Sequence, residues 1–316
     1  MGSLFIIGNG FDLAHGIPTA YKEFRKYIIN RYPNSLLSRD RTVSVDEVNG
    51  LQIEEAAAEA LLYAMDHASG EEWNDFENAL SRIHFYDKIP GYAGERHEEG
   101  TYEHQQEVTQ FLMIAGMISR ALTDSATACW QEFFSSWIKT VEVTVESSAV
   151  KPHDNLISMF HDADAEFMTF NYTKTLQQVY GVRVVKHIHN RVGQKLIFGH
   201  GNDDPWYFEP EGDRPTFGST DLEAFLASLR KDTDKQLRKY NDFFRKLGPE
   251  IDKVYSYGFS YSKVDSPYIK EVVHRISSDA TWYFTAHEAK NTKEFGKKKS
   301  KLRRYGFKGQ FDVFDG

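Results

Sequence analysis

Apolar residues in this chain follow two patterns, short continuous runs that suit buried strands and spaced positions that suit helices. The first run covers residues 4–7, which is long enough for a buried parallel strand. Further strand patterns occur at 165–170, 182–188, 195–198, 253–257, 281–285 and 310–314. Helical patterns lie between these strands, so the sequence predicts an α/β fold with a mainly parallel sheet.

Helical patterns also gather in one long stretch between the first two strands. Apolar side chains recur at helical spacing at 51–67, 71–83, 105–122 and 127–141. No strand pattern interrupts them. We therefore expect residues 1–34 and 165–316 to form an α/β core and residues 35–164 to form a helical insertion.

Capping signals place the helices of the core. A helix predicted over 173–180 ends at Gly181, a residue that favours the end of a helix. Thr220 and Glu223 have the spacing of a capping box and open one long helix, or two, that ends near residue 247. Another helix is expected over 265–277.

Gly8, Asn9 and Gly10 follow the first strand directly. Glycine allows positive φ and a close approach of a ligand to the backbone, and Thr19 is placed to cap a helix that begins near residue 20. A strand, a glycine turn and a helix start together favour an anion such as a phosphate. The alternative is an ordinary strand-to-helix turn that needs glycine only for its geometry.

The glycine spacing excludes two common nucleotide-binding motifs. The fingerprint G-x-G-x-x-G requires glycine at position 13, where the chain has Leu13. A P-loop requires a Gly-Lys-Ser/Thr sequence after the glycines, and none follows here.

Composition narrows the class of protein. The chain has 316 residues and a net charge of −8, which argues against a nucleic-acid-binding role for the whole molecule. Cys129 is the single cysteine, so an intramolecular disulfide and a Cys₄ zinc site are excluded. No run approaches ~18 apolar residues, and no secretory signal opens the chain. We therefore expect a soluble, cytoplasmic protein without a membrane span.

Polar or glycine clusters follow each of five predicted strands. Beyond the first, they are the clusters at 171–173, 189–190, 200–202 and 258–260. Parallel strands end at one edge of a sheet, and ligands of open α/β sheets bind outside the carboxyl ends of the strands. We therefore expect these clusters to form one crevice.

The opening segment IIGNGFDLAHGIPT (6–19) resembles the signature of the bacterial abortive-infection AbiH family. That family is held to be a divergent branch of the sirtuin-like group, whose Rossmann-type fold also opens with glycine-x-glycine and a later Gly-Ile-Pro. Asp12 stands where sirtuins usually carry serine. The resemblance implies a sirtuin-like fold and a role in antiphage defence.

Two later strand ends extend this resemblance. The segment 169–172, TFNY, resembles the strand end that carries the sirtuin asparagine, which implies that Asn171 orients a water molecule or a ribose hydroxyl. Ile188-His189-Asn190 resembles the Leu/Ile-His-Gly that supplies the sirtuin general base. His189 would then accept a proton, and Asn190 would need the left-handed conformation that asparagine tolerates.

The resemblance implies NAD as the substrate and the nicotinamide–ribose bond as the bond that is cleaved. Asn171 and His189 would be catalytic. Gly258-Phe-Ser260, followed by Asp265, resembles the element that lines the adenosine half of the sirtuin site. The residues expected to bind the dinucleotide are Gly8, Asn9, Gly10, Asp12, Gly258, Ser260 and Asp265. Within this set, the glycine turn would hold the pyrophosphate, and the two aspartates would bind ribose hydroxyls.

Three other functions remain open on the sequence. A module could bind NAD or ADP-ribose without turnover. A metal-dependent hydrolase could use the H-x-H pair His187 and His189 with His200, Asp203 and Asp204, and His97 and His104 could share another metal site. A nucleic-acid-targeting toxin could act through the basic segment 290–308, particularly Lys297, Lys298 and Lys299. The helical insertion could carry homo-oligomer contacts or respond to an unknown phage trigger.

Overall fold

The structure is a computed structural model that describes residues 2–33, 53–83, 129–147, 149–201 and 219–316. The chain divides into two compact units. Unit 1 consists of residues 1–20, 135–197 and 231–316, and unit 2 of residues 21–134 and 198–230. Compared with the expected division, residues 135–164 group with the sheet, and residues 21–34 and 198–230 group with the helices.

Unit 1 contains a six-stranded sheet in which every strand pair is parallel. Its strands are β1 (Gly2–Ile7), β2 (Ala165–Thr169), β3 (Lys186–His187), β4 (Ile251–Tyr257), β5 (Thr281–Thr285) and β6 (Gln310–Phe314). Their order is β3-β2-β1-β4-β5-β6, the order of a Rossmann fold. The predicted α/β class with a mainly parallel sheet is confirmed, and the order reverses direction between β1 and β4.

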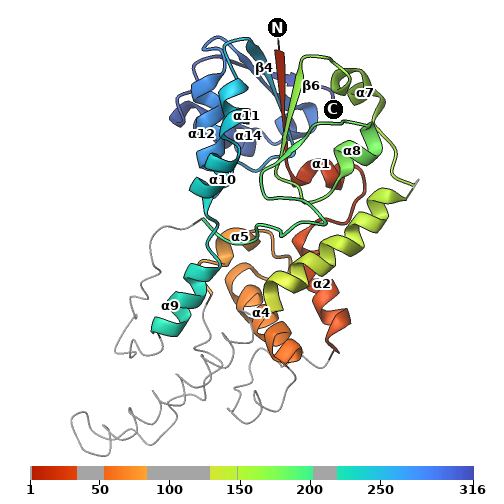
Figure 1. Cartoon of the computed structure of the whole chain (residues 1–316), viewed down its shortest axis with the longest axis vertical. Coiled ribbons are helices and arrows are strands. Elements are labelled where there is room, and N and C mark those ends of the chain that lie inside the picture. The colour runs from red at the N-terminus through yellow and green to blue at the C-terminus, as the bar shows by residue number, and fades with distance from the viewer. Residues whose placement is uncertain (1, 34–52, 84–128, 148, 202–218) are drawn as a thin grey trace, which may run out of the picture. The chain divides into compact units, whose positions relative to one another are not determined.

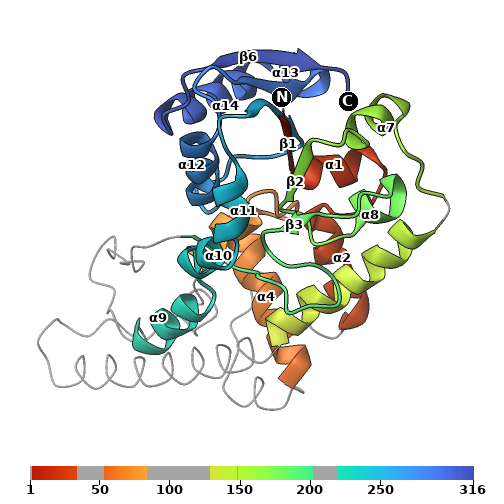
Figure 2. The ribbon, with the colours of Figure 1, turned by 45° about the horizontal axis from the view of Figure 1, so that its top comes forward.

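Helices cover both faces of this sheet. Unit 1 contains α1 (Asn9–Ala14), α7 (Asp154–Phe160), α8 (Thr175–Tyr180), α10 (Thr233–Lys239), α11 (Asn241–Lys246), α12 (Ser266–Arg275), α13 (Ala286–Lys290) and α14 (Thr292–Arg304). One core packs α11, α12 and α14 against the sheet. The opposite core packs α1, α7 and α8 against β1 and β2. Figure 2 shows α12 and α14 to the left of β1 and β2, with α1 and α8 to the right.

Side-chain alternation along β1 explains why both faces are buried. Leu4 and Ile6 belong to the first core, while Phe5 and Ile7 belong to the second. Successive side chains of a strand point to opposite faces, so a central parallel strand needs an uninterrupted apolar run. The run at 4–7 is therefore the sequence signal of the central strand.

Several predicted elements differ in length from those observed. The strand expected over 182–188 is reduced to Lys186–His187 at the sheet edge, and the strand expected at 195–198 is absent. β-branched residues favour strands only where a neighbour is available for pairing. The six-residue helix α1 was not predicted, because a turn that contains Gly8 and Gly10 favours irregular structure.

Unit 2 is helical in the described ranges. It contains α2 (Tyr21–Arg31), α4 (Ile53–Ser69), α5 (Phe76–Ala79) and α9 (Ser219–Ser228). A further helical stretch at 129–146 begins in this unit. Figure 1 labels α2, α4, α5 and α9. Rings of Phe24, Trp73 and Phe76 pack together, and Arg25 binds Asp66 through two hydrogen bonds.

The start of α2 corrects one predicted cap. The helix begins at Tyr21, and the buried Oγ1 of Thr19 makes no hydrogen bond with any residue that the structure describes. The predicted helix 105–122, the pair His97 and His104, and residues Asp203 and Asp204 lie outside the described residues. Among the described helices, none is both long and apolar enough to cross a membrane.

Candidate functional site

A histidine–carboxylate pair lies beyond the carboxyl ends of β3 and β4. His189 Nε2 lies 2.9 Å from Asp265 Oδ1, and both side chains are buried. Oδ2 of Asp265 accepts a hydrogen bond of 2.9 Å from the Ser262 hydroxyl. Both oxygens of the carboxylate are therefore engaged inside the protein. Asp265 thereby orients His189, and its predicted contact with a ribose hydroxyl stays a prediction.

The same contacts explain why Asp265 remains ionised. Burial raises the pKa of Asp265, but the electrostatic effect of the adjacent His189 ring, the hydrogen bonds from His189 and Ser262 and the charge of Lys231 outweigh it. The net pKa lies below the ordinary value. A hydrogen-bonded carboxylate fixes the tautomer of a histidine, as in acyl-transfer triads. Here it places the proton on Nε2, so Nδ1 keeps its lone pair. Nδ1 has no hydrogen-bond partner in the described ranges.

Lys231 completes this cluster. Its side chain is buried, and its Nζ lies 3.4 Å from His189 Nε2. Lys231 could not be identified from the sequence, because it stands in the polar segment KDTDK with no local pattern that marks it as buried. The half-buried Ser262 carries no local signal of its contact with Asp265 either.

Asn171 follows β2 and is held through its backbone. Its N–H donates to Thr169 Oγ1 over 3.1 Å, and its carbonyl oxygen lies 3.1 Å from His187 Nδ1. The alternative in which Asn171 caps the next helix is wrong, because α8 begins at Thr175 with Lys174 at the cap position. The buried Nδ2 of Asn171 makes no hydrogen bond with the described part of the chain.

His187 supports Asn171. Its Nδ1 faces the Asn171 carbonyl, and its Nε2 lies 2.8 Å from Gln177 Nε2. Burial lowers the pKa of His187 to about 4, against the raising effect of the Asn171 carbonyl. The ring is therefore neutral near pH 7, and both of its nitrogens are occupied. That leaves His187 no lone pair for the metal site suggested by the H-x-H pattern, and the described residues contain no group of three or more His, Cys, Asp or Glu side chains that could hold a metal ion. Asp203 and Asp204 of that suggestion lie outside the described residues.

Asp12 is a buried carboxyl with one open oxygen. Its Oδ2 accepts a hydrogen bond of 2.6 Å from Thr173, and Oδ1 has no partner among the described residues. Burial raises the pKa of Asp12 to about 6. The hydroxyls of Thr173 and Thr175 and the nearby Asn171 amide lower it, while the charge of Glu142 raises it further.

The glycine turn packs one backbone segment against another. A Cβ at Gly10 would lie 2.6 Å from the Cα of Gly258, and a Cβ at Gly8 would lie 2.6 Å from the Cα of Phe259. The N–H of Gly8 donates to Tyr257 O and that of Gly10 to Gly258 O. These N–H groups are therefore satisfied by β4 and its following turn, and the pyrophosphate contacts expected of Gly8 and Gly10 stay a prediction.

Three more residues singled out in the sequence, Asn9, Asn190 and Ser260, follow the strands β1, β3 and β4. The exposed Asn9 donates from Nδ2 to Thr19 O over 3.0 Å, and Ser260 is exposed. Asn190 has a φ of 62°, so the predicted left-handed conformation is confirmed.

The basic residues of α14 contact their own unit. Lys298 pairs with Glu288 and Lys297 with Glu294, while Lys301 donates to Tyr261 O over 2.8 Å. Lys298 thereby links α14 to α13 and Lys301 links it to the loop after β4, while the Lys297–Glu294 pair lies within α14.

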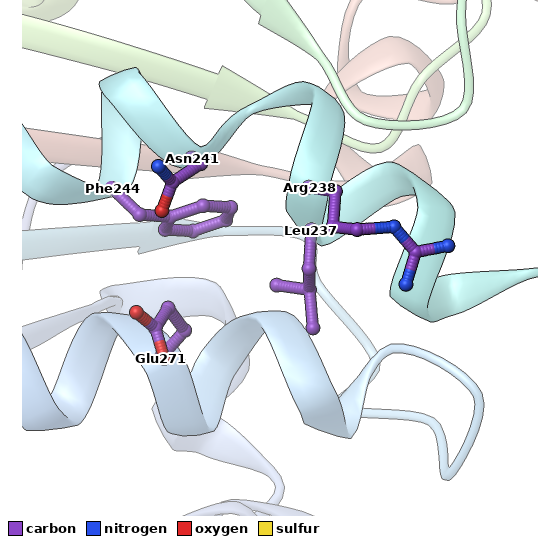
Figure 3. A pocket seen from close by; sticks show the side chains of 5 residues that line it. All are labelled: Leu237, Arg238, Asn241, Phe244 and Glu271. Atoms are coloured by element: carbon purple, nitrogen blue, oxygen red, sulfur yellow. The ribbon is translucent and has the colours of Figure 1, made fainter.

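A surface pocket lies between α10, α11 and α12 of unit 1. It has a volume of about 280 Å³ and is lined by Leu237, Arg238, Asn241, Phe244 and Glu271. Figure 3 shows these side chains between α10, α11 and α12. None of them belongs to the cluster described above.

The comparisons with known proteins agree with the opening motif. The family model described as Bacteriophage abortive infection AbiH matches residues 4–286. Neither the search of curated proteins nor the search of solved structures found a match. The matched range runs from within β1 to just beyond β5 and includes every residue of the candidate site. The chain therefore belongs to the AbiH family, which connects it with abortive infection by bacteriophage.

Proposed function

We propose that this chain is an abortive-infection effector that hydrolyses the nicotinamide–ribose bond of NAD. Family membership supports the phage-related role. The motifs at 6–19, 169–172 and 188–190 resemble those of sirtuin-like proteins, which supports placing the chain in an NAD-binding branch. Fold and family do not define a reaction, so the proposal depends on the site.

One observation carries the proposal: three buried polar atoms, for which the described residues offer no hydrogen-bond partner, follow three adjacent strands. Asp12 Oδ1 lies beyond β1, Asn171 Nδ2 beyond β2 and His189 Nδ1 beyond β3. Unsatisfied buried polar groups are costly and therefore rare. A carboxylate oxygen, an amide N–H and an imidazole lone pair at one sheet edge are suited to a polar ligand with hydroxyl groups.

These groups match the needs of N-ribosyl hydrolysis. The C–N electron pair leaves with nicotinamide, whose ring nitrogen is positively charged in NAD, so the leaving group needs no added proton. Positive charge then develops on the ribose, and the Asp12 carboxylate would stabilise it. A water molecule attacks the anomeric carbon and gives its proton to His189 Nδ1. The Asn171 amide would donate to that water or to a ribose hydroxyl.

The test is to incubate the purified full chain with NAD and to measure nicotinamide and ADP-ribose. His189→Ala and Asn171→Ala should each lower the rate about 100-fold or more, because a general base or a positioning group contributes on this scale. His161→Ala is the matched control, because His161 is exposed and its Nδ1 contacts only its own helix at Ile157 O. Thermal unfolding of each variant verifies that it is folded.

Two outcomes would contradict the proposal. Equal nicotinamide release by wild type, His189→Ala and Asn171→Ala would remove the assigned site. NAD binding by wild type without any nicotinamide release would instead identify a sensing module that binds the dinucleotide without turnover.

A further inference from the structure

His15 belongs to the opening segment 6–19 but has no part in the proposed reaction. It stands at the C-terminal cap of α1. Its Nδ1 lies 2.7 Å from Phe11 O, and its Nε2 lies 2.6 Å from the hydroxyl oxygen of Tyr180 at the end of α8. One ring nitrogen is therefore bound within α1, and the other attaches α1 to α8.

The Tyr180 hydroxyl joins three helices. Its oxygen accepts a hydrogen bond of 2.9 Å from the N–H of His153, the residue that precedes α7. The ring of His153 stacks on that of His15, with ring centroids 4.2 Å apart and an angle of 11° between the planes. Tyr180 is 3% exposed, so α1, α7 and α8 meet at a phenol that is shielded from water.

One arrangement of protons satisfies these contacts. A carbonyl oxygen only accepts, so Nδ1 of His15 carries the proton that faces Phe11 O. In a neutral ring, Nε2 then keeps its lone pair and accepts from the Tyr180 hydroxyl. Burial lowers the pKa of His15, and nearby His153 lowers it further, against the raising effect of the bond to Phe11 O. Burial raises the pKa of Tyr180 to about 12, so near pH 7 the phenol has a proton to donate.

The bond between His15 and Tyr180 holds the second of the two ends of α1. The helix has six residues, too few to be stable in isolation, so its direction depends on tertiary contacts. At its start, the N–H of Gly10 donates to the turn after β4. Asp12 lies between these two attachments, and its Oδ2 accepts from Thr173, two residues before α8 begins. α1 and α8 lie side by side in both views of the fold (Figures 1 and 2).

We propose that Tyr180 is a positioning residue, which acts through His15 to fix α1 and so holds the Asp12 carboxyl in its buried place beyond β1. As a statement about the reaction, this inference rests on the proposed NAD cleavage. As a statement about the placement of Asp12, it rests only on the hydrogen bonds between α1 and the segment that contains α8.

The primary test follows the Asp12 carboxyl and does not need activity. Carbon NMR of aspartate-labelled protein measures its titration, with Asp12→Asn used to assign the signal. Tyr180→Phe keeps the ring in the core and removes both hydrogen bonds of the hydroxyl. Water should then reach Asp12, and its titration midpoint should move downward by about half a pH unit or more, because burial is the largest cause of its raised pKa. The charge of Glu142, which also raises this pKa, is unchanged in the variant.

Two substitutions at His15 test the same hydrogen bond from its other side. His15→Phe keeps a ring that can stack on His153 but has no acceptor, so it should shift the Asp12 midpoint as Tyr180→Phe does. His15→Gln offers an amide oxygen as the acceptor and should titrate closer to wild type than His15→Phe. Tyr283→Phe removes the hydroxyl of a half-buried tyrosine in β5 and is the matched control. If Tyr180→Phe does not fold, His15→Phe provides the test.

An Asp12 midpoint that is the same in wild type, Tyr180→Phe and His15→Phe would overturn the inference. So would a nitrogen NMR spectrum in which the neutral His15 ring carries its proton on Nε2, because the Tyr180 hydroxyl could then not donate to it.

Rates of nicotinamide release provide the second measurement. Tyr180→Phe should lower kcat about 10-fold with little change in KM, because a displaced Asp12 loses its effect on charge that develops in the transition state. An active Tyr180→Phe protein with the kcat of wild type would overturn the part of the inference that concerns the reaction. Absence of nicotinamide release from wild type would contradict only the proposed function, because the NMR results stand without it.

Discussion

Asp12 is a residue whose burial opposes its ionisation. Its pKa rises from 3.8 to about 6 because the carboxyl is removed from water. Thr173 donates a hydrogen bond to Oδ2, while Oδ1 has no hydrogen-bond partner among the described residues. Burial that opposes ionisation is common where a side chain serves a site. We therefore expect Asp12 to act in the proposed site.

Asp12→Asn should stabilise the protein at neutral pH. Well below the unfolded pKa of 3.8 the carboxyl is protonated in both folded and unfolded chains, so its burial costs nothing. Between the unfolded pKa of 3.8 and the folded pKa of about 6, the unfolded chain ionises first and stability falls with rising pH. Above that range the full cost, roughly 1–3 kcal/mol, remains. The substitution should therefore raise the free energy of unfolding near pH 8.

Denaturant unfolding at about pH 3 and pH 8 checks this sign. The gain should disappear at the lower pH. Asp279→Asn, at an exposed carboxyl, should change stability little at either pH. An Asp12→Asn protein that is destabilised equally at both values would contradict the raised pKa.

The turn after β1 shows how one element depends on another. Gly258 has a φ of 63° and lies against Gly10. Glycines in both turns let the two backbones meet at the place where the strand order reverses. That point of an open α/β sheet is where ligands bind, so this close contact sets the position of α1 and of Asp12.

Gly10→Ala should therefore destabilise the fold. The added Cβ would lie 2.6 Å from the Cα of Gly258, and overpacking of this kind costs roughly 1–3 kcal/mol. Gly296→Ala provides the opposite case, because no atom lies within 4 Å of its added Cβ in α14. That variant should gain roughly 0.5–1 kcal/mol from helix propensity. Equal thermal stability of the two variants would contradict the packing role of Gly10.

At the scale of the whole molecule, the phage-related role and the proposed reaction can be tested together. Expression of the chain should lower phage plaque counts and reduce cellular NAD during infection. His189→Ala and Asn171→Ala should each abolish both effects, while His161→Ala should retain them. The measurements are plaque counts and assays of NAD in infected cells. Protection that persists in His189→Ala would separate the family role from this site.

Much of the sheet could be predicted from the sequence. The runs that form β1, β2, β4, β5 and β6 were recognised, because each depends on residues next to one another. Asn171 and His189 were found because they follow strands directly. The packing of Gly10 against Gly258 could not be predicted, because a phosphate-binding turn and a tightly packed turn both require glycine. The contact of Asp265 with His189 could not be predicted either, because an aspartate can bind a ribose hydroxyl or orient a histidine, and the sequence does not distinguish the two.

The sequence by itself determined the strand pattern, the family signature and the strand ends that carry polar groups. Which buried ionisable side chains contact one another depended on the tertiary structure. His189 meets Asp265 across 76 positions of the chain and Lys231 across 42. No local periodicity reports such a contact, because burial and electrostatic pairing depend on distances that exist only after the strands have assembled.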